Sequence, residues 1–184
     1  MIQTALALRK ATMHDIPKLL AIINSYAADG IMLPRTEFEL SENIRDFSVA
    51  YDGSTLAGCG ALHFYTPAMA EVRSLAVLPA LARQGVGRIV VEALEAEARA
   101  HDLDAIFAFT YVPGFFQKLG FAEVERGELP LKTWKDCLRC PKFQNCDEIA
   151  VMKRLKSVVA AYPDPRFASL HALVQLPTPR RTNA

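Results

Sequence analysis

The segment 71–88, EVRSLAVLPALARQGVGR, constrains the fold more than any other part of the chain. It begins as an apolar-rich run typical of a strand, and Pro79 ends that run. A loop with Gly85 and Gly87 then leads directly into a run with the apolar spacing of a helix. Free backbone N–H groups converge where such a helix begins, and glycines let a ligand approach the backbone closely. The segment therefore predicts a strand–loop–helix unit that can bind a phosphate group.

Hydrophobic periodicity predicts strands and helices on both sides of this unit. Strands are expected at 6–10, 47–51, 56–65, 71–78, 105–110, 121–126 and 148–155. Helices are expected after the N-cap candidate Thr12 as far as Gly30, over about 36–45 with a Thr36 and Glu39 capping box, after Gly85 and Gly87, and at 114–119. This order predicts an α/β fold of the α+β type, with a mixed, mostly antiparallel central sheet flanked by helices.

Length and charge limit the domain organisation and the partners. The chain has 184 residues, which favours one domain, here 1–156, with a cysteine-bearing insertion at about 130–147. The proline-rich segment 157–184 is expected to be an extended or partly disordered tail. The 21 basic and 20 acidic residues are interspersed, which argues against nucleic-acid and membrane partners. The absence of a signal peptide and of a long apolar run indicates a cytoplasmic protein. The sequence does not decide the oligomeric state, and a homodimer is left open.

Two motifs resemble those of the GNAT superfamily of acetyl-CoA-dependent N-acetyltransferases. The family's Val-x-Pro followed by a Gly-x-Gly/Ala phosphate motif is matched by Val77, Pro79, Gly85 and Gly87. Its Phe-Tyr-x-x-x-Gly-Phe segment is matched by Phe115, Phe116, Gly120 and Phe121. The resemblance implies a GNAT fold over 1–156 and acetyl-CoA as the cosubstrate.

The resemblance also implies where acetyl-CoA binds. The strand 71–77 would splay from its neighbour, often through a bulge, so that the pantetheine arm pairs with its backbone and a freed N–H polarises the thioester. The residues expected at the cofactor are Leu75, Ala76, Val77, Arg83, Gln84, Gly85, Val86, Gly87, Arg88 and Phe116. Two positions depart from the family. Ala82 replaces the usual Arg or Gln of the phosphate motif, and Phe116 replaces a tyrosine thought to protonate the departing thiolate, which leaves Thr110 and Tyr111 as the nearest candidate acids.

Three further segments resemble the acetyltransferase domain of N-acetylglutamate synthases: GIMLPRT at 30–36, GCGAL at 58–62 and EVRSLAV at 71–77. By this resemblance Glu71 is the general base, and Arg35, Arg73 and Ser74 contact the acceptor, with Arg35 on its carboxylate. Without the resemblance, Arg35 is equally well a surface arginine at a helix start, and Glu71 an ordinary strand-end residue. The implied reaction is direct transfer of an acetyl group to the α-amine of glutamate or a similar acidic amino acid. The alternatives are a GNAT enzyme for another primary amine, and a CoA-binding or metal-binding regulatory module without turnover.

The insertion carries Cys137, Cys140 and Cys146, whose close spacing suits thiolate ligands of zinc or an iron–sulfur cluster. A closed site would need a fourth ligand, for which Cys59 is one candidate. Packed reduced thiols or a redox disulfide explain the spacing equally well. Basic residues in the same insertion could instead form a lid over an acidic substrate, or a solvated face.

Overall fold

The computed structural model describes residues 6–129, 137–138 and 140–156. Its strands are β1 (Ala7–Lys10), β2 (Phe47–Asp52), β3 (Thr55–Phe64), β4 (Met69–Val77), β5 (Ala105–Thr110), β6 (Ala122–Glu123) and β7 (Ile149–Arg154). Its α-helices are α1 (Ile16–Ala28), α2 (Glu37–Glu42), α3 (Val86–Ala100) and α4 (Pro113–Gln117). The expected tail lies outside the described residues, as does part of the expected insertion.

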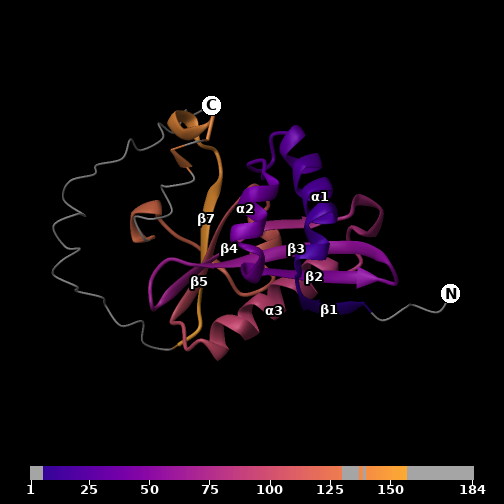
Figure 1. Cartoon of the computed structure of the whole chain (residues 1–184). Coiled ribbons are helices and arrows are strands. Elements are labelled where there is room, and N and C mark those ends of the chain that lie inside the picture. Colours follow the sequence, from indigo (N-terminus) through magenta and orange to yellow (C-terminus); the bar gives the residue numbers. More distant parts are fainter. Residues whose placement is uncertain (1–5, 130–136, 139, 157–184) are drawn as a thin grey trace.

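The described strands form one mixed sheet in the order β1-β2-β3-β4-β5-β7-β6. Every neighbouring pair is antiparallel except β4 and β5, which run parallel. Figure 1 shows β5 and β7 running steeply across the direction of β2 and β3. The prediction of a mixed, mostly antiparallel sheet flanked by helices is confirmed.

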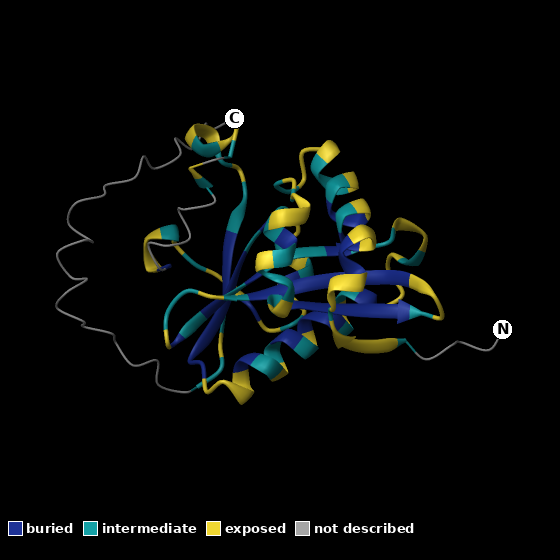
Figure 2. Ribbon diagram, viewed as in Figure 1, coloured by how far each residue is buried: buried dark blue, intermediate teal, exposed yellow. Residues whose placement is uncertain are grey.

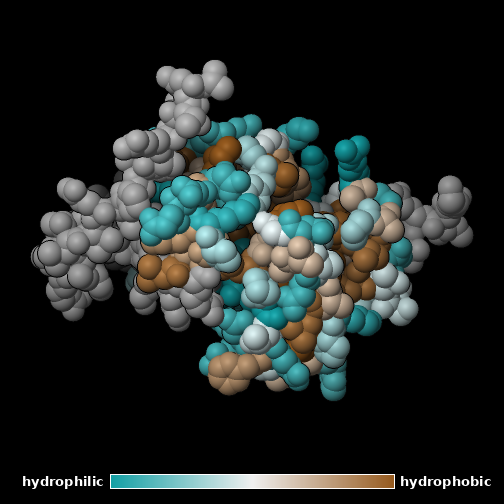
Figure 3. Space-filling view, turned by 90° about the horizontal axis from the view of Figure 1, so that it is seen from above, coloured by the Kyte–Doolittle hydropathy of each residue, from teal (hydrophilic) through white to brown (hydrophobic). Residues whose placement is uncertain are grey.

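Helices cover both faces of this sheet (Figure 1). On one face, α3 buries Val90 and Leu94 in a cluster with residues of the central strands. On the other face, α1 buries Leu19 and Ile23 against a second cluster. Figure 2 shows that the strands between these helices are the most continuously buried part of the molecule. The view in Figure 3 shows hydrophobic residues interspersed among hydrophilic ones, and no helix in the described part is long and apolar enough to cross a membrane.

Local sequence signals explain several boundaries. Thr36 caps α2, its Oγ1 accepting a hydrogen bond from the Glu39 N–H at 3.2 Å, as the predicted capping box requires. The helix itself is shorter than the predicted range 36–45, because a separate 3-10 helix follows at Ile44–Asp46. The strand predicted at 121–126 is also too long, since only Ala122–Glu123 pairs with β7.

The junction between β1 and α1 depends on one buried carboxylate. Asp15 is 2% exposed and accepts hydrogen bonds from Arg9, the Thr12 N–H and the Tyr51 hydroxyl, the last at 2.7 Å. The hydrogen bond from Arg9 is the main cause that lowers the pKa of Asp15 below its usual range. This network anchors the first helix to the sheet.

The central feature of the sheet is a bulge in β4. Ala61 pairs with Arg73 and Cys59 pairs with Ala76, so two residues of β4, Ser74 and Leu75, lie opposite one residue of β3. Ser74 has a positive φ of 50°, which shows where the backbone departs from the extended form.

Just before the bulge, β4 separates from β5. Their parallel pairing ends at Glu71 and Phe107, although β4 continues to Val77 and β5 to Thr110. In the described residues no strand pairs with this edge of β4 after Glu71. The predicted bulge and splay are therefore both present.

Candidate active site

A cleft of about 390 Å³ lies where β4 and β5 separate. Residues of four segments meet around it: the loop between α1 and α2, the second half of β4, the end of β5 with the start of α4, and the segment before β7. The predicted site residues among its lining are Arg35, Glu71, Arg73, Ser74, Leu75, Thr110, Tyr111, Phe116, Cys137, Cys140 and Cys146. The fold thus brings all six predicted catalytic and acceptor residues to one place.

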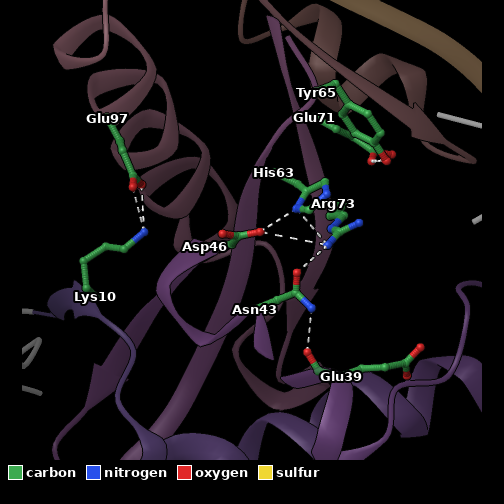
Figure 4. Close-up of polar contacts among 9 residues, drawn as sticks. All are labelled: Lys10, Glu39, Asn43, Asp46, His63, Tyr65, Glu71, Arg73 and Glu97. Atoms are coloured by element: carbon green, nitrogen blue, oxygen red, sulfur yellow. Dashed lines mark hydrogen bonds and ion pairs between the residues drawn. The ribbon is translucent and has the colours of Figure 1, made fainter. Parts of the chain in front are cut away.

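Glu71 lies at the apex of the splay. Its backbone pairs with His63 of β3 on one side and with Phe107 of β5 on the other, so the sheet fixes its position. One carboxylate oxygen, Oε2, accepts a hydrogen bond from the Tyr65 hydroxyl at 3.0 Å (Figure 4). A carboxylate at this place can accept a proton from a group that enters the cleft.

Arg35 enters the cleft from the loop that precedes α2. Asn24 of α1 clamps its backbone, because the Arg35 N–H donates to Asn24 Oδ1 and Asn24 Nδ2 donates to the Arg35 carbonyl, both at 2.9 Å. The loop is thereby tied to a helix of the core, and the guanidinium extends from a fixed point. A planar guanidinium in this position suits a carboxylate ligand.

Arg73 and Ser74 lie at the bulge, and the structure adds a contact that the sequence did not predict. The Arg73 guanidinium donates to Asn43 Oδ1 at 3.5 Å and lies 3.9 Å from Asp46. It is also 3.0 Å from His63 Nδ1, while that nitrogen lies 2.6 Å from Asp46 (Figure 4). Arg73 therefore ties the bulged part of β4 to the segment after α2, although it also lines the cleft.

The two candidate acids differ in their surroundings. Thr110 is 6% exposed, and its Oγ1 accepts a hydrogen bond from the Val112 N–H at 3.0 Å. The Tyr111 hydroxyl accepts a hydrogen bond from Lys142 Nζ at 3.1 Å. Burial raises the pKa of Tyr111, with Lys142 acting in the opposite direction. Tyr111 therefore keeps its proton at neutral pH, and it is less buried than Thr110.

Phe116 occupies the place between the cleft and the core. It is 3% exposed and makes edge-to-face contacts with Phe115 and Phe121 at centroid distances of 5.1 and 5.2 Å. Its ring lines the cleft but carries no group that can donate a proton. It provides an apolar wall.

The predicted phosphate cradle lies outside this cleft, at the start of α3. Gly85 is the N-cap residue with a φ of 86°, and α3 begins at Val86. Val86 is 2% exposed, so it can offer only its backbone N–H, whereas Arg83, Gln84 and Arg88 are exposed. The first N–H groups of a helix have no acceptor within the helix and attract anions. A loop of this geometry can bind an anion.

The three cysteines of the insertion border the cleft as free thiols. Burial is the main cause that raises the pKa of Cys137 to about 12, so this thiol stays protonated. The Cys146 thiol donates to Glu148 Oε2 at 3.9 Å. In the described part of the chain, no three His, Cys, Asp or Glu side chains are grouped as a metal site. Cys59 is fully buried beside the Ser74 carbonyl at 3.7 Å and is no part of the cleft. The described residues therefore give the metal prediction no support.

Sequence reasoning missed two charged residues of the cleft, Arg126 and Glu148. Arg126 Nη2 donates to the carbonyls of Cys146 and Glu148 at 3.2 and 2.5 Å, and so holds the segment before β7 in place. Burial raises the pKa of Glu148, while the charge of Arg126 opposes the shift. No spacing in the sequence indicates these contacts, because the partners are about twenty residues apart and meet only through the sheet.

Comparisons with known proteins agree with this geometry. Residues 18–121 match the model of the acetyltransferase (GNAT) family. The chain is 42% identical over 147 residues to an uncharacterised N-acetyltransferase of Chlorobaculum tepidum, covering 80% of this chain and 95% of that protein. It is 33% identical over 120 residues to an amino-acid acetyltransferase of Mycobacterium tuberculosis, covering 64% of this chain and 68% of the relative.

Solved structures give the same result. The N-acetylglutamate synthase of Neisseria gonorrhoeae, complexed with coenzyme A and N-acetyl-glutamate, superposes with a TM-score of 0.75 at 27% identity, covering 82% of this chain and 35% of the synthase. A Mycobacterium tuberculosis protein in complex with CoA superposes with a TM-score of 0.70 at 26% identity, covering 82% of this chain and 99% of the other. The splayed strands, the helix N-terminus and these matches agree, and the chain belongs to the GNAT family of acetyltransferases.

Proposed function

We propose that this enzyme transfers the acetyl group of acetyl-CoA to the α-amine of glutamate or a closely similar acidic amino acid. The observation that carries the proposal is the charge of the cleft. Among the described residues that line the cleft, the basic ones outnumber the acidic ones four to two, namely Arg35, Arg73, Arg126 and Lys142 against Glu71 and Glu148. An acceptor with two carboxylates and one ammonium group complements this set, whereas a polyamine does not.

Acetyl-CoA binding is inferred from two separate parts of the fold. After Glu71, the edge of β4 that faced β5 pairs with no described strand, and it can pair with the amide groups of a pantetheine arm. The start of α3 can accept the pyrophosphate through its backbone N–H groups. The related structures with bound CoA support this arrangement. The thioester would then lie near the bulge, beside the cleft that takes the acceptor.

The reaction needs one group to accept a proton and one to donate it. Glu71 takes the proton of the entering ammonium, directly or through a water molecule, and the amine attacks the thioester carbonyl. A backbone N–H freed at the bulge stabilises the negative charge on that oxygen. Tyr111 is the proposed proton donor to the departing thiolate, because it lines the cleft and burial raises the pKa of its phenol. No covalent acetyl-enzyme is needed, since both reactants are held together.

The acceptor is tested by measuring CoA release with a thiol reagent across a panel of amines. We expect the highest kcat/KM with glutamate, then with glutamine and aspartate. Polyamines, lysine and peptide N-termini serve as the comparison group. A higher kcat/KM for a polyamine or a peptide would contradict the acceptor proposal. Tight CoA binding without transfer to any amine would favour a regulatory module.

The cradle is tested with Gly85→Val. Gly85 has a positive φ of 86°, and a Cβ there meets no atom within 4 Å, so the valine side chain would extend into the space proposed for the pyrophosphate. We expect the Kd for CoA, measured by calorimetry, to rise by about tenfold or more.

The left-handed backbone makes valine unfavourable for a second reason, at a cost of about 1–2 kcal/mol. Gly53→Val is the matched control, because Gly53 also has a positive φ of 56° and open surroundings in the turn between β2 and β3. It should lower the melting temperature in a similar way and leave the Kd for CoA unchanged. Equal Kd values for both variants would contradict the cradle.

A further inference from the structure

Tyr65 is held rigidly next to the proposed base, although it is no part of the cleft lining. It directly follows β3, and its backbone N–H donates to the Met69 carbonyl at 3.1 Å across the turn to β4. Its ring lies 5.0 Å from His63, edge-on, and 5.8 Å from Phe107, both measured between ring centroids. The turn fixes its backbone, and the two rings fix its side chain.

The hydroxyl of Tyr65 reaches the carboxylate of Glu71. It donates to Glu71 Oε2 at 3.0 Å, and the two side chains lie next to each other in Figure 4. Glu71 is the last residue of β4 that pairs with β5, so its backbone cannot follow a change in its side chain. The contact therefore joins a fixed donor to a carboxylate on a fixed backbone.

We propose that Tyr65 is a positioning residue for the reaction: its hydroxyl sets the orientation of the Glu71 carboxylate at the apex of the splay and favours its ionised form. The inference rests on the proposed function through the role of Glu71 as base. A hydrogen bond to an ionised carboxylate stabilises that form relative to the protonated one. A base that is ionised and correctly oriented before the ammonium arrives accepts its proton without a prior rearrangement.

Other groups around Glu71 act on the same equilibrium. His63 lies opposite on β3, and Arg73 is two residues along on the same side of β4. Cys137, in the segment before β7, also lies near Glu71. The pKa of Cys137 is raised mainly by burial, then by Cys146, and then by the charge of Glu71. Glu148 acts on the same thiol and adds negative charge to this end of the cleft. These charges bear on Glu71 with or without Tyr65, whereas the hydroxyl contact is lost in a single-atom change.

The experiment is Tyr65→Phe, which removes the hydroxyl and keeps the ring contacts with His63 and Phe107. The pH profile of kcat/KM is measured with the amine that the wild-type enzyme acetylates best. We expect an acid limb displaced upward by about half a pH unit to one unit, and therefore a fall in kcat/KM of about three- to tenfold on the acid side of that limb. At higher pH the variant should approach the wild type. In a Glu71→Gln background, Tyr65→Phe should have no further effect.

Tyr51→Phe is the matched control, because its hydroxyl donates to Asp15 at 2.7 Å, away from the cleft. Tyr51→Phe should lower the free energy of unfolding and leave the acid limb of the kcat/KM profile at its wild-type pH. A wild-type profile for Tyr65→Phe would overturn the inference, and so would a fall independent of pH or a further fall in the Glu71→Gln background. If Glu71→Gln retains its pH-dependent deficit in those cases, the proposed function stands and only the role of Tyr65 fails.

Discussion

Glu71→Gln is expected to lower kcat/KM at pH 7 by about 10²- to 10⁴-fold, with a deficit that shrinks toward pH 9–10. An ammonium group has no lone pair with which to attack. An α-amino group in a peptide titrates near about 8, and the carboxylate of a free amino acid raises this value, so roughly a tenth or less is nucleophilic at pH 7. Glutamine keeps the size and hydrogen bonding of Glu71 but cannot accept the proton.

The sign of the pH effect follows from the substrate. As the pH rises, solvent deprotonates the amine, and the enzyme needs its own base less. The wild-type and variant rates should therefore converge at high pH, as measured in steady-state assays over a range where both proteins remain folded. The matched control is Glu92→Gln, at an exposed position of α3, which should leave the profile unchanged. A deficit independent of pH would assign Glu71 to binding or structure, and the absence of a deficit would place the base elsewhere.

The positions of the main elements could be predicted from the sequence because each depends on local signals. Pro79, Gly85 and the apolar spacing that follows them define the β4–α3 unit, and they do so without reference to the rest of the chain. The Thr36 and Glu39 capping box also acts within one turn. The bulge and splay of β4 came from the family resemblance, since no periodicity marks Ser74 as a residue with positive φ.

Contacts between distant segments could not be predicted. The role of Arg73 depends on Asn43 and Asp46, which reach β4 only after the segment behind α2 folds against the sheet. Arg126 and Glu148 likewise meet only because β6, which precedes Arg126, pairs with β7, which follows Glu148. The close spacing of Cys137, Cys140 and Cys146 indicated ligands, but among the described residues no three His, Cys, Asp or Glu side chains are grouped for a metal ion. Spacing sets which residues can meet, whereas burial and charge set what they do.

Glycine at position 60 shows how the bulge constrains the sequence around it. Gly60 lies opposite the two bulged residues, and a Cβ there would lie 2.9 Å from Val90 Cγ1 and 3.3 Å from Leu75 Cδ1. The bulge turns Leu75 toward α3, so only a residue without a side chain fits between them. The shape of the site is thus specified from the core side as well as from the cleft.

Arg35→Ala is expected to raise the KM for glutamate by roughly 10- to 150-fold and to leave the KM for acetyl-CoA nearly unchanged. The change removes a charge-assisted pair between a guanidinium and a carboxylate, which is worth roughly 1.5–3 kcal/mol. Arg35 lines the cleft, whereas the proposed CoA phosphates lie at the start of α3. The two KM values, measured by varying each substrate at saturation of the other, should therefore respond separately.

Two further variants separate binding from structure. Asn24→Ala removes the two 2.9 Å hydrogen bonds that hold the Arg35 backbone but keeps the guanidinium. We therefore expect Asn24→Ala to raise the KM for glutamate as well, but by less than Arg35→Ala does. Arg154→Ala, at an exposed position at the end of β7, is the matched control and should change neither KM. A contact with the glutamate carboxylate affects only the KM for glutamate. If Arg35→Ala raised the KM for glutamate and the KM for acetyl-CoA equally, the loop before α2 would have lost its shape. An unchanged KM for glutamate would mean that the acceptor carboxylate is held by the other basic residues of the cleft.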